Sequence, residues 1–185
     1  MMIRSRILAS LVAPLLITAV IPLYAVKEVE MPDNFGSAEW ALNNWSESVN
    51  YLRYIARDDI RGEFEQRAAD ERLEAWESFW AAVDKQNGTL EQESRAQYFQ
   101  RIRYANENFG SILLPGWKTE MGETWIRLGP PDWRDRYAMR GAGRNLEVWN
   151  YMDSRDTYLV FMDRTGVGDY DLLNYGAMIE EVYFY

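Results

Sequence analysis

The chain of 185 residues contains no cysteine and no histidine. Without cysteine it forms no disulfide, holds no zinc–thiolate site and offers no thiolate nucleophile. Without histidine it lacks the usual general base near neutral pH and the commonest ligand of transition metals. Catalysis would therefore depend on carboxylates, tyrosines, hydroxyls and the three lysines Lys27, Lys85 and Lys118. The sequence predicts no cofactor held by this chain.

Positive charge is also scarce, with 20 basic against 29 acidic residues and a net charge of -9. Arg4 and Arg6 precede Lys27 and no acidic residue does, so the part from Lys27 onward carries 18 basic and 29 acidic residues, or -11. An acidic body repels phosphate backbones, which argues against nucleic-acid binding. It repels anionic lipid headgroups equally, so attachment to a membrane requires an inserted segment.

The N-terminus supplies such a segment. Residues 7–26 carry no charge and follow Arg4 and Arg6. A helix of this length spans about 30 Å, the hydrocarbon thickness of a bilayer. We expect residues 1–27 to form a single-pass signal anchor in the cytoplasmic (inner) membrane, contacting lipid through residues 7–26, with the N-terminus inside and the body in the periplasm. The alternative is a secretory signal cleaved after Ala25, which leaves the body in the same compartment.

The rest of the chain divides into a helical half and a strand-rich half. Residues 28–36 contain turn-forming residues and are interpreted as a linker. Residues 37–110 repeat apolar side chains at helical spacing, whereas residues 111–185 alternate them between glycine and proline turns. Helices followed by strands indicate an α+β fold, with a small antiparallel sheet receiving the helices on one face. We expect residues 37–185 to form one domain.

Three helices are expected in the helical half. Ser37 caps the first, which runs to Ala56, and the second spans residues 64–88. The third opens with a capping box in which Gln92 bonds back to Thr89, and it stops at Gly110. In the strand-rich half, the expected strands are 124–128, 146–151, 158–162, 170–173 and 182–185.

The most specific pattern lies where the two halves meet. It reads Gly116-Trp117-Lys118-Thr119-Glu120 and continues as Leu128-Gly129-Pro130-Pro131-Asp132. With further blocks at 104–110, 146–151 and 161–170, it resembles the bacterial GWxTD-domain family over residues 51–175, although the motif's last Asp is Glu120 here. The resemblance implies an extracytoplasmic protein whose family has no established activity. The motif residues expected to be structural are Gly116, Trp117, Thr119, Glu120, Gly129, Pro130, Pro131 and Asp132.

Acidic residues provide the only candidate metal ligands. Asp163, Asp169 and Asp171 surround two glycines, as in an acidic calcium loop. Counted from Asp163 as an EF-hand, however, the loop has valine at its fifth position and asparagine in place of the final glutamate. A hairpin turn that needs glycine at positive φ explains the same residues, and we predict the turn and no metal. Adjacent acids such as Asp58-Asp59 and Glu180-Glu181 are typical of a solvated surface.

Aromatic residues are abundant, including eight tryptophans. Most lie on predicted core faces. Trp40, Trp133 and the C-terminal Tyr183-Phe184-Tyr185 are instead expected to be exposed and to contact a partner, because aromatic side chains are enriched at protein interfaces. Exposed aromatic rings also form platforms for sugars.

These observations favour a non-catalytic, membrane-anchored extracytoplasmic accessory or scaffold subunit. It would dock on other protein subunits of a larger membrane complex, for which a photosynthetic or respiratory assembly is one candidate host. The alternative is a periplasmic glycan-binding module that uses aromatic and acidic side chains. A carboxylate-dependent hydrolase is the third hypothesis, and it requires two separate carboxylates at one site.

Overall fold

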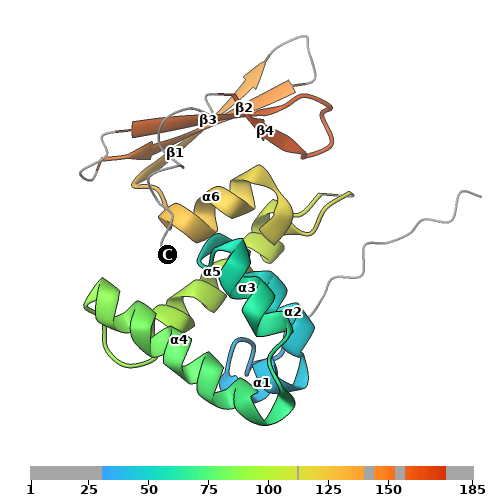
Figure 1. The fold of residues 1–185 in the computed structure, drawn as a ribbon. Helices are drawn as coiled ribbons and strands as arrows, with labels where there is room; N and C mark the ends of the chain where they lie inside the picture. The colour runs from blue at the N-terminus through green and yellow to red at the C-terminus, as the bar shows by residue number, and fades with distance from the viewer. Residues whose placement is uncertain (1–30, 112, 140–143, 153–156, 174–185) are drawn as a thin grey trace, which may run out of the picture.

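A computed structural model describes residues 31–111, 113–139, 144–152 and 157–173. Helices occupy one side of the molecule and a four-stranded antiparallel sheet the other, with the last helix, α6, beside the sheet (Figure 1). The expected α+β order of helices followed by a small antiparallel sheet is confirmed. The predicted anchor at residues 1–27 lies outside the described residues. No helix within the described ranges is both long and apolar enough to cross a membrane.

The helical side is more segmented than the sequence predicts. Its elements are α1 (Ala38–Asn43), α2 (Trp45–Tyr51), η1 (Leu52–Tyr54), α3 (Asp58–Glu65), η2 (Ala69–Glu71), α4 (Arg72–Asn87), α5 (Glu93–Phe109), η3 (Gly116–Lys118) and α6 (Glu120–Leu128). Ser37 caps α1 as expected, because its Oγ accepts a hydrogen bond from the Trp40 amide at 3.1 Å. The single helix expected to Ala56 is wrong, since Asn44 leaves helical geometry at φ -126° and separates α1 from α2.

The connection between α4 and α5 also corrects the sequence prediction. Gly88, at φ 67°, ends α4 as expected, but α5 begins at Glu93 and Thr89 does not cap it. The buried carboxylate of Asp84 does so, accepting the amides of Ser94 at 2.8 Å and Gln92 at 2.6 Å. Thr89 instead donates its hydroxyl to Asp84. An ionised carboxylate is a stronger acceptor for helix N-terminal amides than a hydroxyl, so the capping box is not used.

Burial alone would raise the pKa of Asp84, but hydrogen bonds from Ser94, Thr89 and Gln92 outweigh it and hold this pKa below its ordinary value. A folded pKa below the unfolded value of about 3.9 gives stability that is present above that pH and lost as pH falls through the folded pKa. Asp84→Asn should therefore cost more stability at about pH 7 than at about pH 3. Urea unfolding at both pH values, with exposed Asp70→Asn as the control, measures this; an equal cost at both would contradict it.

The sheet has the strand order β1 (Trp133–Met139), β2 (Arg144–Tyr151), β3 (Thr157–Asp163) and β4 (Tyr170–Leu172). The strands expected at 146–151 and 158–162 lie within β2 and β3, and the one expected at 170–173 is β4, which ends one residue earlier. The strand expected at 182–185 lies outside the described residues. β1 was not predicted.

The strand expected at 124–128 is wrong, because this segment is the end of α6. Thr119 Oγ1 accepts the Gly122 amide at 3.0 Å and so caps the helix. A run of five residues fits both a strand and a helix by periodicity, so the N-cap decides between them.

Aromatic side chains fill the core of the helical side. Trp76 and Trp80 are fully buried and contact each other and Phe99. The expectation that Trp40 is exposed is wrong, since it is only 7% exposed and lies edge-on to Phe35 at 4.7 Å between ring centroids. The short helix α1 directs Trp40 into the hydrophobic core, so this side chain is not available to a partner.

Trp117 anchors the central motif to the helices. It is buried, with its ring 4.7 Å from that of Tyr51, and its backbone oxygen accepts the Tyr54 hydroxyl at 2.9 Å. Trp117→Ala should therefore lower the free energy of unfolding by about 3–5 kcal/mol, as for other buried aromatic residues. Denaturant unfolding measures the loss, with the exposed neighbour Lys118→Ala as control. Equal stability of the two variants would show that Trp117 does not hold the motif in place.

Candidate functional site

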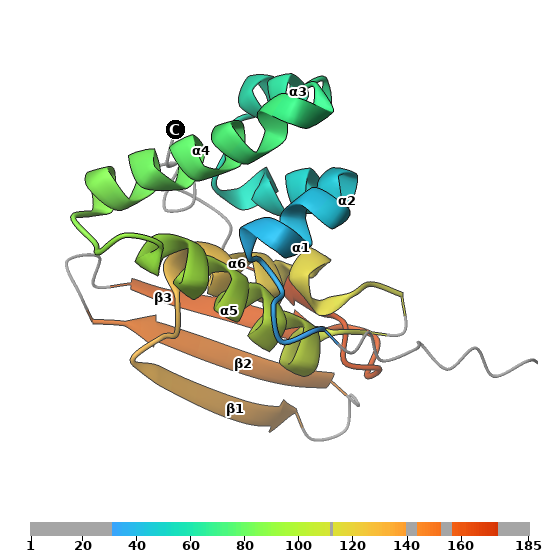
Figure 2. The ribbon, with the colours of Figure 1, turned by 90° about the horizontal axis from the view of Figure 1, so that it is seen from below.

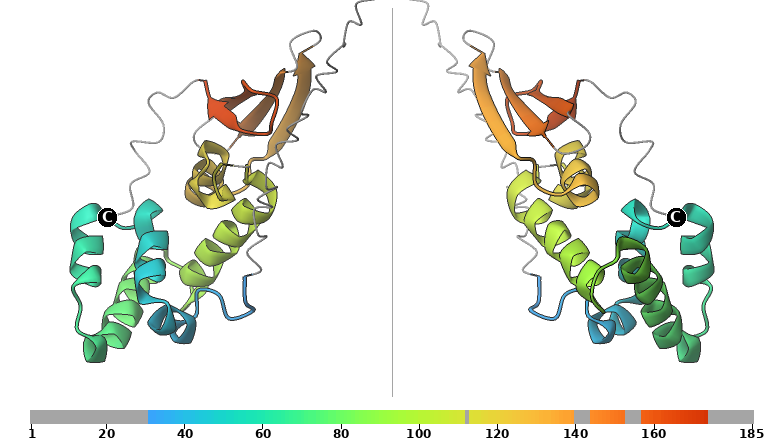
Figure 3. Two further views of the ribbon diagram at one scale, coloured as in Figure 1. Left: turned by 90° about the vertical axis from the view of Figure 1, so that its right-hand side faces the viewer. Right: turned by 90° about the vertical axis from the view of Figure 1, so that its left-hand side faces the viewer.

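The two faces of the sheet have different environments. The C-terminal part of α5 and the helix α6 lie on the inner face, where the rings of Phe109 and Trp125 contact Trp149 of β2. The described helices all lie on this side of the sheet (Figures 2 and 3). No helix within the described ranges covers the outer face. Because successive side chains of a strand point to opposite faces, each residue of β1 to β3 lies either on the inner face, which the helices cover, or on the outer face.

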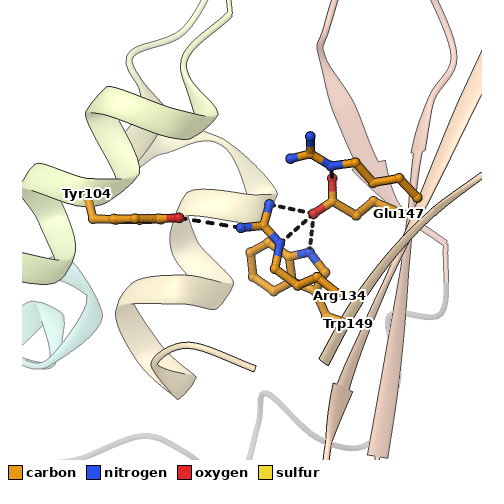
Figure 4. A network of polar contacts seen from close by, with 5 residues as sticks. Tyr104, Arg134, Glu147 and Trp149 are labelled. Carbon is orange, nitrogen blue, oxygen red and sulfur yellow. Dashed lines mark hydrogen bonds and ion pairs between the residues drawn. The ribbon is translucent and has the colours of Figure 1, made fainter. Parts of the chain in front are cut away.

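A buried carboxylate organises the inner face. Glu147 of β2 is 2% exposed, and one of its oxygens accepts Arg134 Nε at 2.7 Å and Trp149 Nε1 at 2.8 Å. Its other oxygen accepts Arg136 Nε at 2.9 Å. Figure 4 shows the carboxylate of Glu147 beside the guanidinium of Arg134 and the indole of Trp149. Two cations and one indole thus neutralise and orient a carboxylate that would otherwise be costly to bury.

Arg134 extends this network to the helices. Its guanidinium reaches the Tyr104 hydroxyl at 3.5 Å (Figure 4). It also lies over the rings of Trp149, at 5.0 Å, and Phe109, at 5.4 Å. Tyr104 and Phe109 belong to α5, whereas Arg134 belongs to β1. The charged side chain therefore joins the edge strand both to its neighbour β2 and to α5, through contacts worth about 0.5–2 kcal/mol each when desolvated.

The geometry of this network gives it a structural role. Both oxygens of Glu147 already accept hydrogen bonds from fixed donors. A general base needs a lone pair directed at a substrate. The lone pairs of Glu147 that these donors occupy are directed at β1 and at Trp149 instead. The network instead fixes β1, whose alternate residues Trp133, Asp135 and Tyr137 face the other way.

Glu147→Gln should lower the free energy of unfolding by about 3–5 kcal/mol, because it leaves the charge of Arg134 buried without its carboxylate. Arg136→Gln should cost less than about 1 kcal/mol, because the side chain of Arg136 is 74% exposed. Denaturant unfolding of both variants measures the difference. Equal and small losses would contradict a structural role for the buried network.

The outer face carries the exposed aromatic residues. Trp133 is 60% exposed, Tyr137 54% and Tyr158 62%. The prediction that Trp133 is exposed is confirmed. Its indole Nε1 donates to Asp135 two residues along β1 at 3.3 Å, which orients the ring on this face.

Strand register continues this face across the sheet. Tyr137 is opposite Leu146, which is opposite Met162, and Asp135 is opposite Val148. Four half-buried apolar residues lie between the aromatic ones: Leu146, Val148, Val160 and Met162. We call Trp133, Tyr137, Tyr158 and these four residues the outer sheet face. Apolar and aromatic surface that no described helix covers on one side of a sheet is typical of an interaction site.

The motif at 116–132 joins the helices to the inner face of the sheet. A Cβ atom on Gly116 would lie 1.9 Å from the Ala105 backbone oxygen, so only glycine allows this close approach to α5. Glu120, the first residue of α6, accepts the amide of Leu172 in β4. Asp132 accepts the amide of Met152 at 2.7 Å. These three residues connect the motif to α5, to β4 and to the end of β2.

A comparison with models of protein families matches residues 34–178 to the GWxTD domain. The chain belongs to the GWxTD-domain family. This match extends beyond the expected 51–175 and includes α1 and α2. Comparisons with curated proteins and with solved structures found no match.

The three acidic residues near the end of the GWxTD domain do not converge. Asp163 is buried and accepts the amides of Gly166 at 2.7 Å and Gly168 at 2.9 Å. Both glycines have positive φ, as the hairpin interpretation requires. Asp171 pairs with Arg164 at 2.9 Å. The neighbouring Asp169 is half-buried. Within the described residues, no group of three or more acidic side chains is placed to hold a metal ion.

Sequence reasoning missed the Glu147 network of this GWxTD domain. The signal was present as Arg134-x-Arg136 and Glu147-x-Trp149, which alternation places on one face of each strand. Recognising it required knowing that residues 133–139 form a strand that pairs with β2. Of the other partner-contact residues predicted from the sequence, Tyr183, Phe184 and Tyr185 lie outside the described residues.

Proposed function

We propose that this GWxTD domain is a non-catalytic accessory or scaffold subunit that docks on another protein through its outer sheet face. The exposure of Trp133, Tyr137 and Tyr158 on a face that no described helix covers carries the proposal. Large aromatic side chains contribute most of the binding energy at protein interfaces, especially when apolar neighbours exclude water around them.

The charges around this face indicate the chemistry of the partner. Asp135 lies on it in β1, at one edge of the sheet, and Asp171, which pairs with Arg164, lies in β4 at the other edge. The body from Lys27 onward has a net charge of -11. We therefore expect a partner subunit with an apolar patch flanked by basic residues, because charge complementarity steers association and excludes wrong partners.

The proposal includes membrane attachment through residues 7–26. Their twenty uncharged residues after Arg4 and Arg6 support a single-pass anchor in the inner membrane with the body in the periplasm. An anchor confines the domain to the membrane surface and so raises its effective concentration near membrane-embedded subunits. A docking face of moderate affinity is sufficient under that condition.

The described acidic residues support docking over hydrolysis. Asp58 pairs with Arg61, and Asp59 with Arg57, all on the surface of α3 and its N-cap. Glu147, the most buried of the described glutamates, is paired with arginine on both oxygens. A glycoside hydrolase needs one carboxyl group that keeps a proton and a second that faces it across the substrate. Asp58, Asp59 and Glu147 are instead each paired with arginine.

Trp133→Ala in the full-length protein should abolish co-purification with its membrane complex after gentle detergent extraction. The stability of the variant should change by no more than about 0.5 kcal/mol, because the side chain is exposed. Leu90→Ala is the matched control, since it removes an apolar side chain that is 79% exposed in the loop between α4 and α5. The control should co-purify as the wild type does.

Retention of every partner by Trp133→Ala would refute docking through the outer sheet face. Oligosaccharide binding by the intact protein, lost in Trp133→Ala, in the absence of any co-purifying protein would assign the same face to glycan recognition instead. If the intact mass shows that the mature chain begins after Ala25, the anchor is removed from the proposal. The docking face would be unchanged.

A further inference from the structure

Two adjacent leucines between α5 and η3 are exposed to solvent. Leu113 is 77% exposed and Leu114 40%. The amides of both donate to Ser111 Oγ, at 3.2 and 3.1 Å, and the Ser111 amide donates to the Leu114 backbone oxygen at 3.0 Å. The described part of this turn projects beyond the helices (Figures 1 and 2). The turn therefore fixes the backbone of two leucines whose side chains stay largely in water.

The described chain begins beside this turn. Arg103 of α5 donates from Nη1 to the Met31 backbone oxygen at 3.0 Å and from Nη2 to that of Pro32 at 2.8 Å. The Met31 sulfur accepts from Asn106 Nδ2 at 3.9 Å, and Asn106 Oδ1 accepts the Trp117 amide at 3.0 Å. Met31 is thus held against the end of α5 that leads into the turn.

Close backbone packing places the leucines at the same end of α5. A Cβ atom on Gly110 would lie 3.5 Å from the Asn106 backbone oxygen and 3.9 Å from that of Leu114. Gly110 therefore lies between Asn106, which contacts Met31, and Leu114. It follows that Met31 and the exposed leucines share one side of the body.

The membrane attachment in the proposed function gives this side a defined neighbour. Only residues 27–30 separate the proposed anchor, residues 7–26, from Met31. The chain from residue 26 to residue 31 spans at most about 18 Å, even when it is fully extended. A bilayer that holds the anchor therefore lies close to Met31, and so close to Leu113 and Leu114.

We propose that Leu113 and Leu114 insert into the interfacial layer of this bilayer. Aliphatic side chains transfer favourably from water to the boundary between lipid headgroups and acyl chains. The exposed charged residues that flank the contact in the sequence are one base, Lys118, and three acids, Asp33, Glu107 and Glu120. Because positive charge is not in excess here, the contact is hydrophobic and requires no anionic lipid.

This inference rests on the anchor in the proposed function and adds an orientation to it. An anchor alone lets the domain turn about its linker, whereas a second contact with the bilayer restricts that rotation. In Figure 1 the described residues between α5 and η3 project to one side of the layers, while the outer sheet face lies at the top. The contact therefore leaves Trp133 and Tyr137 accessible to a partner subunit.

The absence of native cysteine allows a fluorophore to be attached at one chosen position. In the full-length protein, reconstituted into neutral vesicles with brominated acyl chains, a fluorophore at Leu113→Cys should be quenched at least about threefold more than the same fluorophore at Leu90→Cys. Leu90 is the matched control, because it is 79% exposed in the loop between α4 and α5. Adding Leu114→Glu should reduce the quenching at position 113 to that of the control, because a carboxylate opposes insertion.

Flotation of the vesicles separates this inference from the anchor. Equal quenching at positions 113 and 90, in protein that floats with the vesicles, would overturn the membrane contact and leave the proposed function as it stands. Protein that does not float would refute the anchor and the membrane contact together, while docking through the outer sheet face would be unaffected.

Two further outcomes would also overturn the hydrophobic contact. Quenching at position 113 that requires anionic lipid would show that charge holds the domain on the bilayer. Absence of quenching in pure lipid, with shielding of position 113 from a water-soluble quencher in the native membrane, would show that a protein subunit covers the leucines.

Discussion

The presentation of the outer sheet face depends on the contact of Glu147 with Arg134 and Arg136. β1 is an edge strand that pairs only with β2 among the described strands, and such strands are prone to fray or to pair wrongly. A buried carboxylate that accepts two arginines from β1 fixes its register by charge. One-residue slippage would exchange the two faces, burying Trp133 and exposing Arg134. The network therefore determines which side chains meet solvent.

The family motif fixes the sheet relative to the helices. Gly116 packs against the backbone of α5, and Thr119 caps α6. Glu120 then reaches β4, which the shorter aspartate of the family pattern would do less easily. The motif holds together the layers whose far side is the outer sheet face.

The sequence predicted helix ends and strands correctly where a single local signal determined them. Ser37 and Gly88 mark helix ends through their own capping geometry, and alternation identified β2 and β3. It failed where a distant residue decided the outcome. Asp84 displaced the expected cap at Thr89, and the inward turn of α1 buried Trp40. The exposure of Trp133 was predicted, but the face around it depends on strand register, which no single segment encodes.

Hydroxyl-radical footprinting of the protein in its native membrane, compared with the isolated protein in detergent, tests the docking face most directly. The account predicts that oxidation of Trp133 and Tyr137 falls in the membrane, while oxidation of Leu73 and Leu90, exposed on the helical side, does not change. Protection of Leu73 and Leu90 with unchanged oxidation of Trp133 and Tyr137 would contradict it, because the partner would then contact the helices and leave the outer sheet face open.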